Sequence, residues 1–255
     1  MSDDRDLAKI EKALLAAREA VSQFTPGRIE SEQKAGGDPV TEADLLLDRV
    51  LKDILLEPGE GWLSEETADD LARLDKERVW IVDPIDGTRE FIEGIPEWCI
   101  SVGLVINGTP VCGGICNPAA DRLFLGMTGA GVTLNGQSVR VTEKAKLDGA
   151  KVLASRSEVK RGEWVRFENA PFEVIPMGSV AYKLACVAAG LADATFTLVP
   201  KNEWDIAAGC ALVTTAGGRI KNSPQSLRPF NHPTTRMDHL IASGKALYQA
   251  LLDYI

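Results

Sequence analysis

The pattern of hydrophobic and polar residues changes from helical to strand-like after about sixty residues. Apolar residues recur every three to four positions over 6–23 and again over 41–55, which predicts two amphipathic helices. The second segment opens with Thr41 and has Asp44 three residues later, an arrangement typical of a capping box. Two helices are therefore expected before the main run of strands.

The following segments favour strands, and the second half of the chain favours alternating strands and helices. Residues 78–84 form an apolar run that leads into a turn, and residues 99–118 predict a hairpin with Asn107-Gly108 as its tight turn. A further pair of strands is expected within 123–141. Beyond residue 150 the predicted strands are 152–155 and 193–199, and the predicted helices are 179–190 and 204–218. The interpretation is a sheet-rich α+β part over 1–145 and an α/β part over 146–255.

Composition and charge narrow the possible partners. The chain is 45% hydrophobic and 25% charged, as in ordinary globular proteins, and its net charge is -9. Nucleic-acid duplexes and anionic membranes favour basic surfaces, so neither is expected as the main partner. A small anionic substrate remains compatible, because local cations or metal ions reverse the charge within a pocket. The sequence has no signal-peptide pattern and no apolar run of about 18 residues, so a cytoplasmic protein is expected.

Cysteines and histidines are not expected to carry the chemistry. Cys112 and Cys116 have a loose metal-ligand spacing, but they lie in a strand-like run without a second cysteine or histidine pair. Reduced, buried thiols are predicted for all five cysteines, which are Cys99, Cys112, Cys116, Cys186 and Cys210. His232 and His239 lie near the C-terminus, outside every motif, so histidine-based acid–base chemistry is not expected.

An acidic motif follows the apolar run at 78–82. Asp83 and Asp86 stand three residues apart at the end of a buried strand, where two like charges resist ionisation. A divalent cation would resolve this repulsion, and Mg²⁺ prefers hard oxygen ligands, including a carbonyl such as that of Ile85. A helix beginning at Gly87 would offer free N–H groups to a phosphate, and Thr88 can orient a water. The alternative is an ordinary turn before a helix.

Three further segments add acidic groups, namely 38–44, 64–66 and 204–205. Glu65 and Glu66 follow a short apolar segment, so one of them is a candidate metal ligand, although paired glutamates are also typical of solvated surfaces. Asp205 lies at the start of a predicted helix, either as its N-cap or as a cation ligand beside a phosphate.

The four segments, in this order and at these spacings, resemble the inositol monophosphatase superfamily of metal-dependent phosphatases. Two signature stretches carry the resemblance, WIVDPIDGTREF at 80–91 and WDIAAGCALVTTAGG at 204–218. It extends from Lys34 to Gly218. The fold that it implies is a layered αβαβα sandwich similar to that of fructose-1,6-bisphosphatase.

The resemblance also implies a set of metal ligands. Glu65, Asp83 and the Ile85 carbonyl match the ligands of one Mg²⁺, and Asp83, Asp86 and Asp205 match those of a second. Glu65 also resembles a contributor to a weaker third site. Such metals neutralise the phosphate and lower the pKa of a bound water, so no side-chain nucleophile is needed.

Other roles are implied for the residues around these ligands. Thr88 and Asp44 are similar to the pair that polarises the attacking water, with Glu66 nearby, and Lys34 matches a lysine near the active-site loop. Arg89 or Lys201 can meet a second phosphate, or can simply be solvated. The positions implied at the phosphate and the rest of the substrate are Asp86, Gly87, Thr88, Gly178, Ser179 and Asp205.

The resemblance leaves the substrate open. The superfamily includes phosphatases for inositol monophosphates, 3′-phosphoadenosine 5′-phosphate, fructose 1,6-bisphosphate and histidinol phosphate. The stretches DGTREF at 86–91 and EWDIAAG at 203–209 resemble bisphosphate nucleotidases of the CysQ type, which favours 3′-phosphoadenosine 5′-phosphate. The alternative is an inositol-1-monophosphatase or a related sugar or histidinol phosphatase, because the chain is short and has no obvious adenine-binding insertion.

Two readings outside this activity are less compatible with the sequence. A non-catalytic family member would be expected to lack a metal ligand, and none is missing here. Neither a P-loop nor a strand-bound dinucleotide fingerprint is present. The resemblance further implies a homodimer and sensitivity to lithium.

Overall fold

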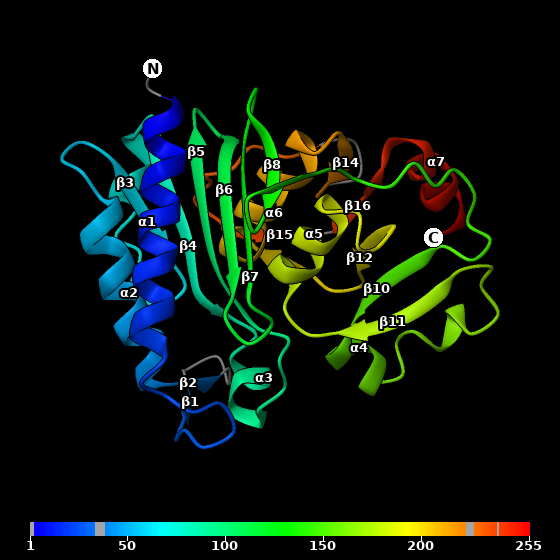
Figure 1. The fold of residues 1–255 in the computed structure, drawn as a ribbon, viewed down its shortest axis with the longest axis horizontal. Coiled ribbons are helices and arrows are strands. Elements are labelled where there is room, and N and C mark those ends of the chain that lie inside the picture. Colours follow the sequence, from blue (N-terminus) through cyan, green and yellow to red (C-terminus); the bar gives the residue numbers. More distant parts are fainter. Residues whose placement is uncertain (1–2, 34–38, 223–226, 239) are drawn as a thin grey trace.

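The elements of the chain form five successive layers (Figure 1). The structure is a computed structural model that describes residues 3–33, 39–222, 227–238 and 240–255. Two helices cover a seven-stranded sheet, two more helices separate it from a five-stranded sheet, and the last helix covers the far side. This arrangement confirms the expected αβαβα sandwich.

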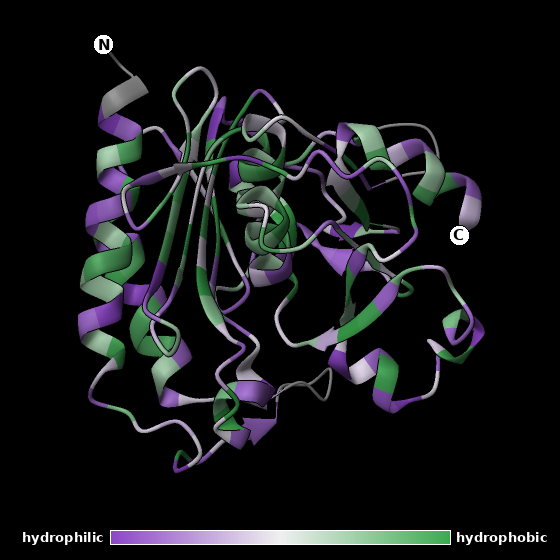
Figure 2. Cartoon of the chain, turned by 45° about the vertical axis from the view of Figure 1, so that its right-hand side comes forward, coloured by the Kyte–Doolittle hydropathy of each residue, from purple (hydrophilic) through white to green (hydrophobic). Residues whose placement is uncertain are grey.

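The first layer confirms both predicted helices, α1 (Asp3–Val21) and α2 (Glu42–Leu55). Their apolar faces are fully buried against the first sheet, while α1 carries hydrophilic bands on its outer side (Figure 2). The capping box predicted for α2 is present, with Thr41 as the N-cap and its N–H donating to Asp44 Oδ2 at 2.8 Å. Asp44 is thereby fixed at the N-terminal end of the helix.

The second layer is a seven-stranded sheet in the order β3-β4-β5-β6-β7-β8-β9. β3 pairs with β4 in parallel, and every other pair is antiparallel. The expected turn at Asn107-Gly108 is confirmed, with φ values of 47° and 76° that suit a two-residue hairpin. The bounds are β3 (Gly61–Ser64), β4 (Arg78–Asp86), β5 (Cys99–Ile106), β6 (Thr109–Asn117), β7 (Arg122–Met127), β8 (Gly131–Leu134) and β9 (Gln137–Val139).

The prediction of two strands within 123–141 was incomplete, because this part of the chain forms three strands, β7, β8 and β9. Asn135 and Gly136 both have positive φ and form a second tight turn, which folds β9 back onto β8. All five cysteines are buried and reduced, as predicted.

The five-stranded sheet has the order β11-β10-β12-β16-β14. β10 is parallel to both of its neighbours, and β16 is antiparallel to β12 and β14. Its outer face is covered by α7 (Lys245–Tyr254), α4 (Arg156–Lys160) and the 3₁₀ turn η2 (Val165–Phe167). The bounds are β10 (Lys151–Ser155), β11 (Glu173–Met177), β12 (Ala194–Thr197), β14 (Gly218–Lys221) and β16 (Leu240–Gly244).

The smaller elements lie mainly in the connections. They are β1 (Glu32–Gln33) paired with β2 (Pro39–Val40), η1 (Ala72–Asp75), α3 (Thr88–Glu93), and β13 (Lys201–Asn202) paired with β15 (Arg236–Met237). No helix in the described ranges is both long and apolar enough to cross a membrane.

The middle layer consists of α5 (Val180–Ala188) and α6 (Glu203–Thr215), which are apolar on nearly all sides because both sheets cover them. α6 lies directly on the backbone of the β5–β6 hairpin at two glycines. A Cβ at Gly103 would be 2.9 Å from the Ala208 nitrogen, and one at Gly113 would be 2.5 Å from the Ala208 oxygen. This close approach places the start of α6 near the end of β4.

Candidate active site

The candidate site begins at an irregularity near the end of β4. In a regular strand, residues three apart point to opposite faces of the sheet. Here the pairing with β5 shifts between Asp83 and Asp86, across the segment that contains Pro84. Both carboxylates stay buried, with exposed fractions of 1% and 9%, and both line the same cavity.

Glu65 and Asp205 reach this cavity from two other elements. Glu65 directly follows β3, the parallel neighbour of β4, and its N–H donates to the Val82 carbonyl at 3.3 Å. Asp205 lies in the first turn of α6, where it accepts a hydrogen bond of 2.8 Å from the Asn202 N–H. Asn202 is the N-cap, so the alternative interpretation of Asp205 as the N-cap was wrong.

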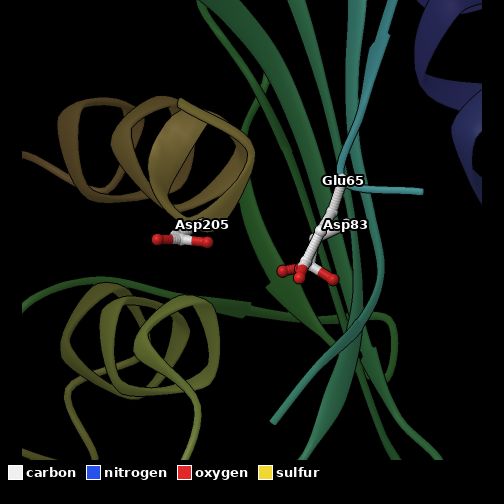
Figure 3. A group of neighbouring side chains, drawn as sticks. All are labelled: Glu65, Asp83 and Asp205. Carbon is white, nitrogen blue, oxygen red and sulfur yellow. The ribbon is translucent and has the colours of Figure 1, made fainter. Parts of the chain in front are cut away.

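One carboxylate oxygen from each of Glu65, Asp83 and Asp205 lies within 4.8 Å of the other two. Figure 3 shows the carboxylates of Glu65 and Asp83 side by side, with Asp205 opposite them at the first turn of α6. Three residues that are distant in the sequence therefore converge on one point.

The chemistry of this group suits a divalent cation. Asp83 Oδ1 is buried and has no hydrogen-bond partner within the described part of the chain. Burial, together with the charges of Glu65 and Asp86, raises the pKa of Asp83 well above its usual range. Burial and the charge of Asp86 raise the pKa of Asp205 to about 8. A hard cation such as Mg²⁺ would remove this repulsion and use the vacant oxygen, so the donor set fits such an ion.

Asp86 lines the cavity but is not one of the three converging carboxylates. Its Oδ2 accepts hydrogen bonds from Ser179 Oγ at 2.6 Å and from the Ala181 N–H at 2.5 Å, both at the start of α5. Burial raises the pKa of Asp86, and these two hydrogen bonds oppose the increase. Since Oδ2 is occupied by α5, Oδ1 is the oxygen available to a cation.

Thr88 connects the cavity to Asp44. Thr88 Oγ1 lies 3.1 Å from Asp44 Oδ1 and 3.0 Å from the Ile85 carbonyl oxygen, and it donates to these acceptors. Thr88 lines the cavity, whereas Asp44 is 1% exposed and lies behind it. Gly87 precedes α3 with φ of 100°, a conformation that favours glycine. The structure thus brings together the pair that the sequence analysis named.

Most of the remaining predicted residues line the cavity, whose volume is about 410 Å³. Gly178, Ser179, Arg89 and Lys201 line it, as do Ile85 and Gly87. Glu66 is half-buried, its N–H donates to Ser64 Oγ, and it is not among the lining residues. His232 does not line the cavity either, and Lys34, Asp38 and His239 lie outside the described residues.

Sequence reasoning missed a buried cation in the cavity wall. Lys183 on α5 is 2% exposed, and its Nζ donates to the carbonyl oxygens of Ser179 at 2.9 Å and of Met177 at 3.3 Å. Burial and the charge of Lys201 lower the pKa of Lys183 to about 8. A single charged residue within an otherwise apolar helix was the available signal. The other lining residues that were not predicted include Glu90, Ser155, Ser157 and Arg161.

Comparison with known proteins assigns this site to a family. The model of the inositol monophosphatase family matches residues 3–254. The chain belongs to the inositol monophosphatase family. Inositol monophosphatase 2 of Solanum lycopersicum is 34% identical over 228 residues, which cover 83% of this chain and 86% of the relative.

Solved structures agree with this family assignment. The extragenic suppressor protein suhB from Bartonella henselae has a TM-score of 0.83 and 26% identity, covering 96% of this chain and 95% of that chain. CysQ from Bacteroides thetaiotaomicron, a bacterial member of the inositol monophosphatase family, has a TM-score of 0.80 and 27% identity, covering 94% and 97%. Members of the family are metal-dependent phosphatases, so the resemblance and the expected hydrolase activity are confirmed.

Proposed function

We propose that this family member is a Mg²⁺-dependent phosphatase that hydrolyses an inositol monophosphate. The observation that carries the proposal is the convergence of Glu65, Asp83 and Asp205 within 4.8 Å, with a buried, unpartnered Asp83 oxygen among the described residues. Asp86 and the Ile85 carbonyl complete the expected ligand set. Bound Mg²⁺ would neutralise phosphate oxygens and lower the pKa of a water molecule.

The protein groups around the ligands are suited to orient a water. The Thr88 hydroxyl has one proton, which it shares between the Asp44 carboxylate and the Ile85 carbonyl. Its lone pairs are therefore free to accept a hydrogen bond from a water in the cavity, and as that water gives a proton to Thr88 Oγ1 the hydroxyl proton can pass to the Asp44 carboxylate. Asp44 is held for this role by the Thr41 N–H and hydroxyl, which donate to its other oxygen at 2.8 and 2.6 Å.

The relatives change the preferred substrate. The sequence motifs favoured 3′-phosphoadenosine 5′-phosphate, with an inositol phosphate as the alternative. The names of the relatives support that alternative better, as in the tomato inositol monophosphatase 2 at 34% identity. A polyol monophosphate also suits a cavity of about 410 Å³ lined mainly by polar groups, because its hydroxyls need hydrogen-bond partners.

A specific observation keeps bisphosphate nucleotidase activity as the second candidate. Besides the acidic group, the cavity wall carries the cations Lys183 and Lys201, together with Arg89 and Arg161. Lys183 and Lys201 come in addition to the expected metal ions, and a second phosphate would pair with them, whereas Arg161 is already paired with Glu163 at 2.6 Å. The likeness to CysQ, at 27% identity, supports the same candidate.

A substrate panel tests the proposal. Purified protein should be assayed with inositol 1-phosphate, 3′-phosphoadenosine 5′-phosphate, fructose 1,6-bisphosphate and histidinol phosphate, with Mg²⁺ and after chelation. We expect the highest kcat/KM for inositol 1-phosphate, and loss of turnover on chelation. Preference for the bisphosphate nucleotide would select the second candidate, and turnover unaffected by chelation would remove the metal-based proposal.

A further inference from the structure

The carboxylate of Glu97, in the first half of the chain, accepts hydrogen bonds from two segments of the second half. It lies in the loop between α3 and β5. Arg156 donates to it through Nε at 3.0 Å and through Nη2 at 2.6 Å to each oxygen. The Gly178 N–H donates to Oε2 of the same carboxylate at 2.7 Å. The side chain of Glu97 is only 20% exposed, so this is a partly buried, multiply bonded group.

Both segments that Glu97 holds form part of the cavity wall. Arg156 is the first residue of α4 and directly follows Ser155, which lines the cavity. Gly178 lines the cavity itself and directly precedes Ser179, the N-cap of α5. The carboxylate therefore connects the first sheet to the far wall of the site.

The turn at Gly178 and Ser179 needs support from outside its own backbone. Ser179 has φ of 54°, in the left-handed region that non-glycine residues seldom occupy. At Gly178 a Cβ would lie 2.5 Å from Glu90 Cγ, so the turn is also closely packed. A conformation of this kind persists when surrounding contacts fix it, and the hydrogen bond from Gly178 to Glu97 is one of these contacts.

The position of this turn affects Asp86, which is one of the expected metal ligands. Ser179 Oγ and the Ala181 N–H both donate to Asp86 Oδ2, so movement of the turn moves the two donors that orient Asp86. On the opposite side, a Cβ at Gly87 would lie 3.1 Å from the Glu97 carbonyl oxygen. The backbone of Glu97 is thus packed against the segment expected to hold the phosphate.

We propose that Glu97 is a positioning residue for this site. Its carboxylate holds the Gly178–Ser179 turn against Asp86, and through that turn it sets the affinity for metal and for substrate. The inference rests on the proposed function, because it assumes that Asp86 is a metal ligand. It predicts an order of importance. Glu97 matters more than Arg156, because Gly178 keeps its acceptor when only the guanidinium is removed.

Metal binding and kinetics of single and double variants test this order. Mg²⁺ binding is measured by calorimetry without substrate, and KM and kcat are measured separately, for Glu97→Ala, Arg156→Ala and the double variant. We expect Glu97→Ala to weaken Mg²⁺ binding and to raise KM about tenfold each, the lower end for groups that support metal ligands. Arg156→Ala should have a clearly smaller effect, and the double variant should match Glu97→Ala.

The matched control is Arg18→Ala, which breaks an ion pair of 2.6 Å with Asp121 on the outer face of the first sheet. It should leave Mg²⁺ affinity and KM unchanged. Glu97→Gln keeps one acceptor for Gly178, so we expect it to rescue part of the affinity, and it replaces Glu97→Ala if the alanine variant does not fold. A folded Glu97 variant of either kind with wild-type Mg²⁺ affinity and KM would overturn the inference.

The result also separates this inference from the proposed function. Wild-type protein that binds Mg²⁺ but hydrolyses no substrate of the panel would defeat the proposed function alone, because calorimetry still reports the effect of Glu97. Wild-type protein that binds no Mg²⁺ would overturn both.

Discussion

Asp83 lies in surroundings that disfavour its own charge. Burial and four neighbouring carboxylates raise its pKa, and one of its oxygens has no hydrogen-bond partner in the described structure. Such a residue lowers the stability of the metal-free protein, since a buried charge needs a counter-charge. The proposed metal binding would account for an arrangement that folding alone would disfavour.

Replacing Asp83 by Asn should separate these two effects. The change keeps the size of the side chain and removes one buried negative charge. Without metal we expect a Tm higher by 2–4 °C, which corresponds to about 1 kcal/mol for a chain of this size. Turnover should fall by at least about a hundredfold, since even groups that only support metal ligands cause losses of this size. Thermal melts and phosphatase assays, each with and without Mg²⁺, measure both.

The control is Asp53→Asn on the exposed side of α2, which should change neither Tm nor turnover. Mg²⁺ should raise the Tm of the wild type and of this control, but not that of Asp83→Asn. Near-normal turnover of Asp83→Asn would show that Asp83 is not a ligand.

At the residue scale, the sequence predicted groups whose signal is local. Asp83, Asp86 and Thr88 belong to one short motif at the end of an apolar strand, and the structure places all three at the cavity. Glu97 has no such signal, because its partners Arg156 and Gly178 lie 59 and 81 positions further along the chain. Groups defined by distant partners become visible only after folding.

At the scale of elements, the position of α6 decides where Asp205 lies. The helix packs on the glycines of the β5–β6 hairpin, so its backbone approaches the sheet more closely than a side chain would permit. Its first turn is additionally held by Glu203, whose buried carboxylate accepts from the N–H groups of Asn231 at 2.7 Å and of His232 at 2.9 Å. The geometry of the acidic group therefore depends on helix-to-sheet packing.

Gly113→Ala should disturb this packing and the site together. The added Cβ would lie 2.5 Å from the Ala208 carbonyl oxygen, a backbone atom that moves only if α6 moves. We expect a loss of about 1–3 kcal/mol in the free energy of unfolding, as for other overpacked cores. Because a displaced α6 carries Asp205 with it, Mg²⁺ binding should weaken as well. Urea unfolding and calorimetry measure the two effects.

Thr109→Ala, at an exposed position of the same strand, is the matched control and should stay within about 0.5 kcal/mol of the wild type. Native Mg²⁺ affinity in Gly113→Ala would show that α6 does not position Asp205 through this contact.

Elements with internal patterns could be predicted, and elements defined by their neighbours could not. The periodicity of α1 and α2 and the Asn107-Gly108 turn are properties of the local sequence. β16 is buried along its whole length between β12 and β14, so it shows no alternation of polar and apolar residues. β11 and β14 are also short, and they acquire their role from pairing with distant strands.

At the scale of the whole molecule, charged groups have opposite effects on stability at two places. In the cavity, like charges from both halves of the chain converge and reduce the stability of the metal-free protein. On the far side of the first sheet, opposite charges connect the helical layer to the strands. Arg78 Nη2 donates to Asp6 of α1 at 2.7 Å, and Arg78 Nε donates to Glu60 at 3.0 Å. Trp80 Nε1 donates to Glu60 at 2.7 Å.

This outer network should make stability depend on pH without affecting the site. Burial raises the pKa of Glu60, but hydrogen bonds from Trp80 and Arg78 outweigh it and leave the pKa below its usual value. A carboxyl whose pKa is lower in the folded state stabilises the protein above its unfolded pKa, and that contribution is lost as the pH falls through the folded value.

Glu60→Gln should therefore be less stable than the wild type at neutral pH by roughly 1 kcal/mol, discounted for the partial exposure of Arg78. The difference should shrink as the pH falls below about 4.3, because the wild-type carboxyl is then protonated and resembles the amide. Urea unfolding across this range, with Glu19→Gln on the exposed face of α1 as control, measures the effect. A stability difference that stays constant with pH would show that the charge of Glu60 does not connect these layers, and unchanged phosphatase activity in Glu60→Gln would place its effect in stability alone.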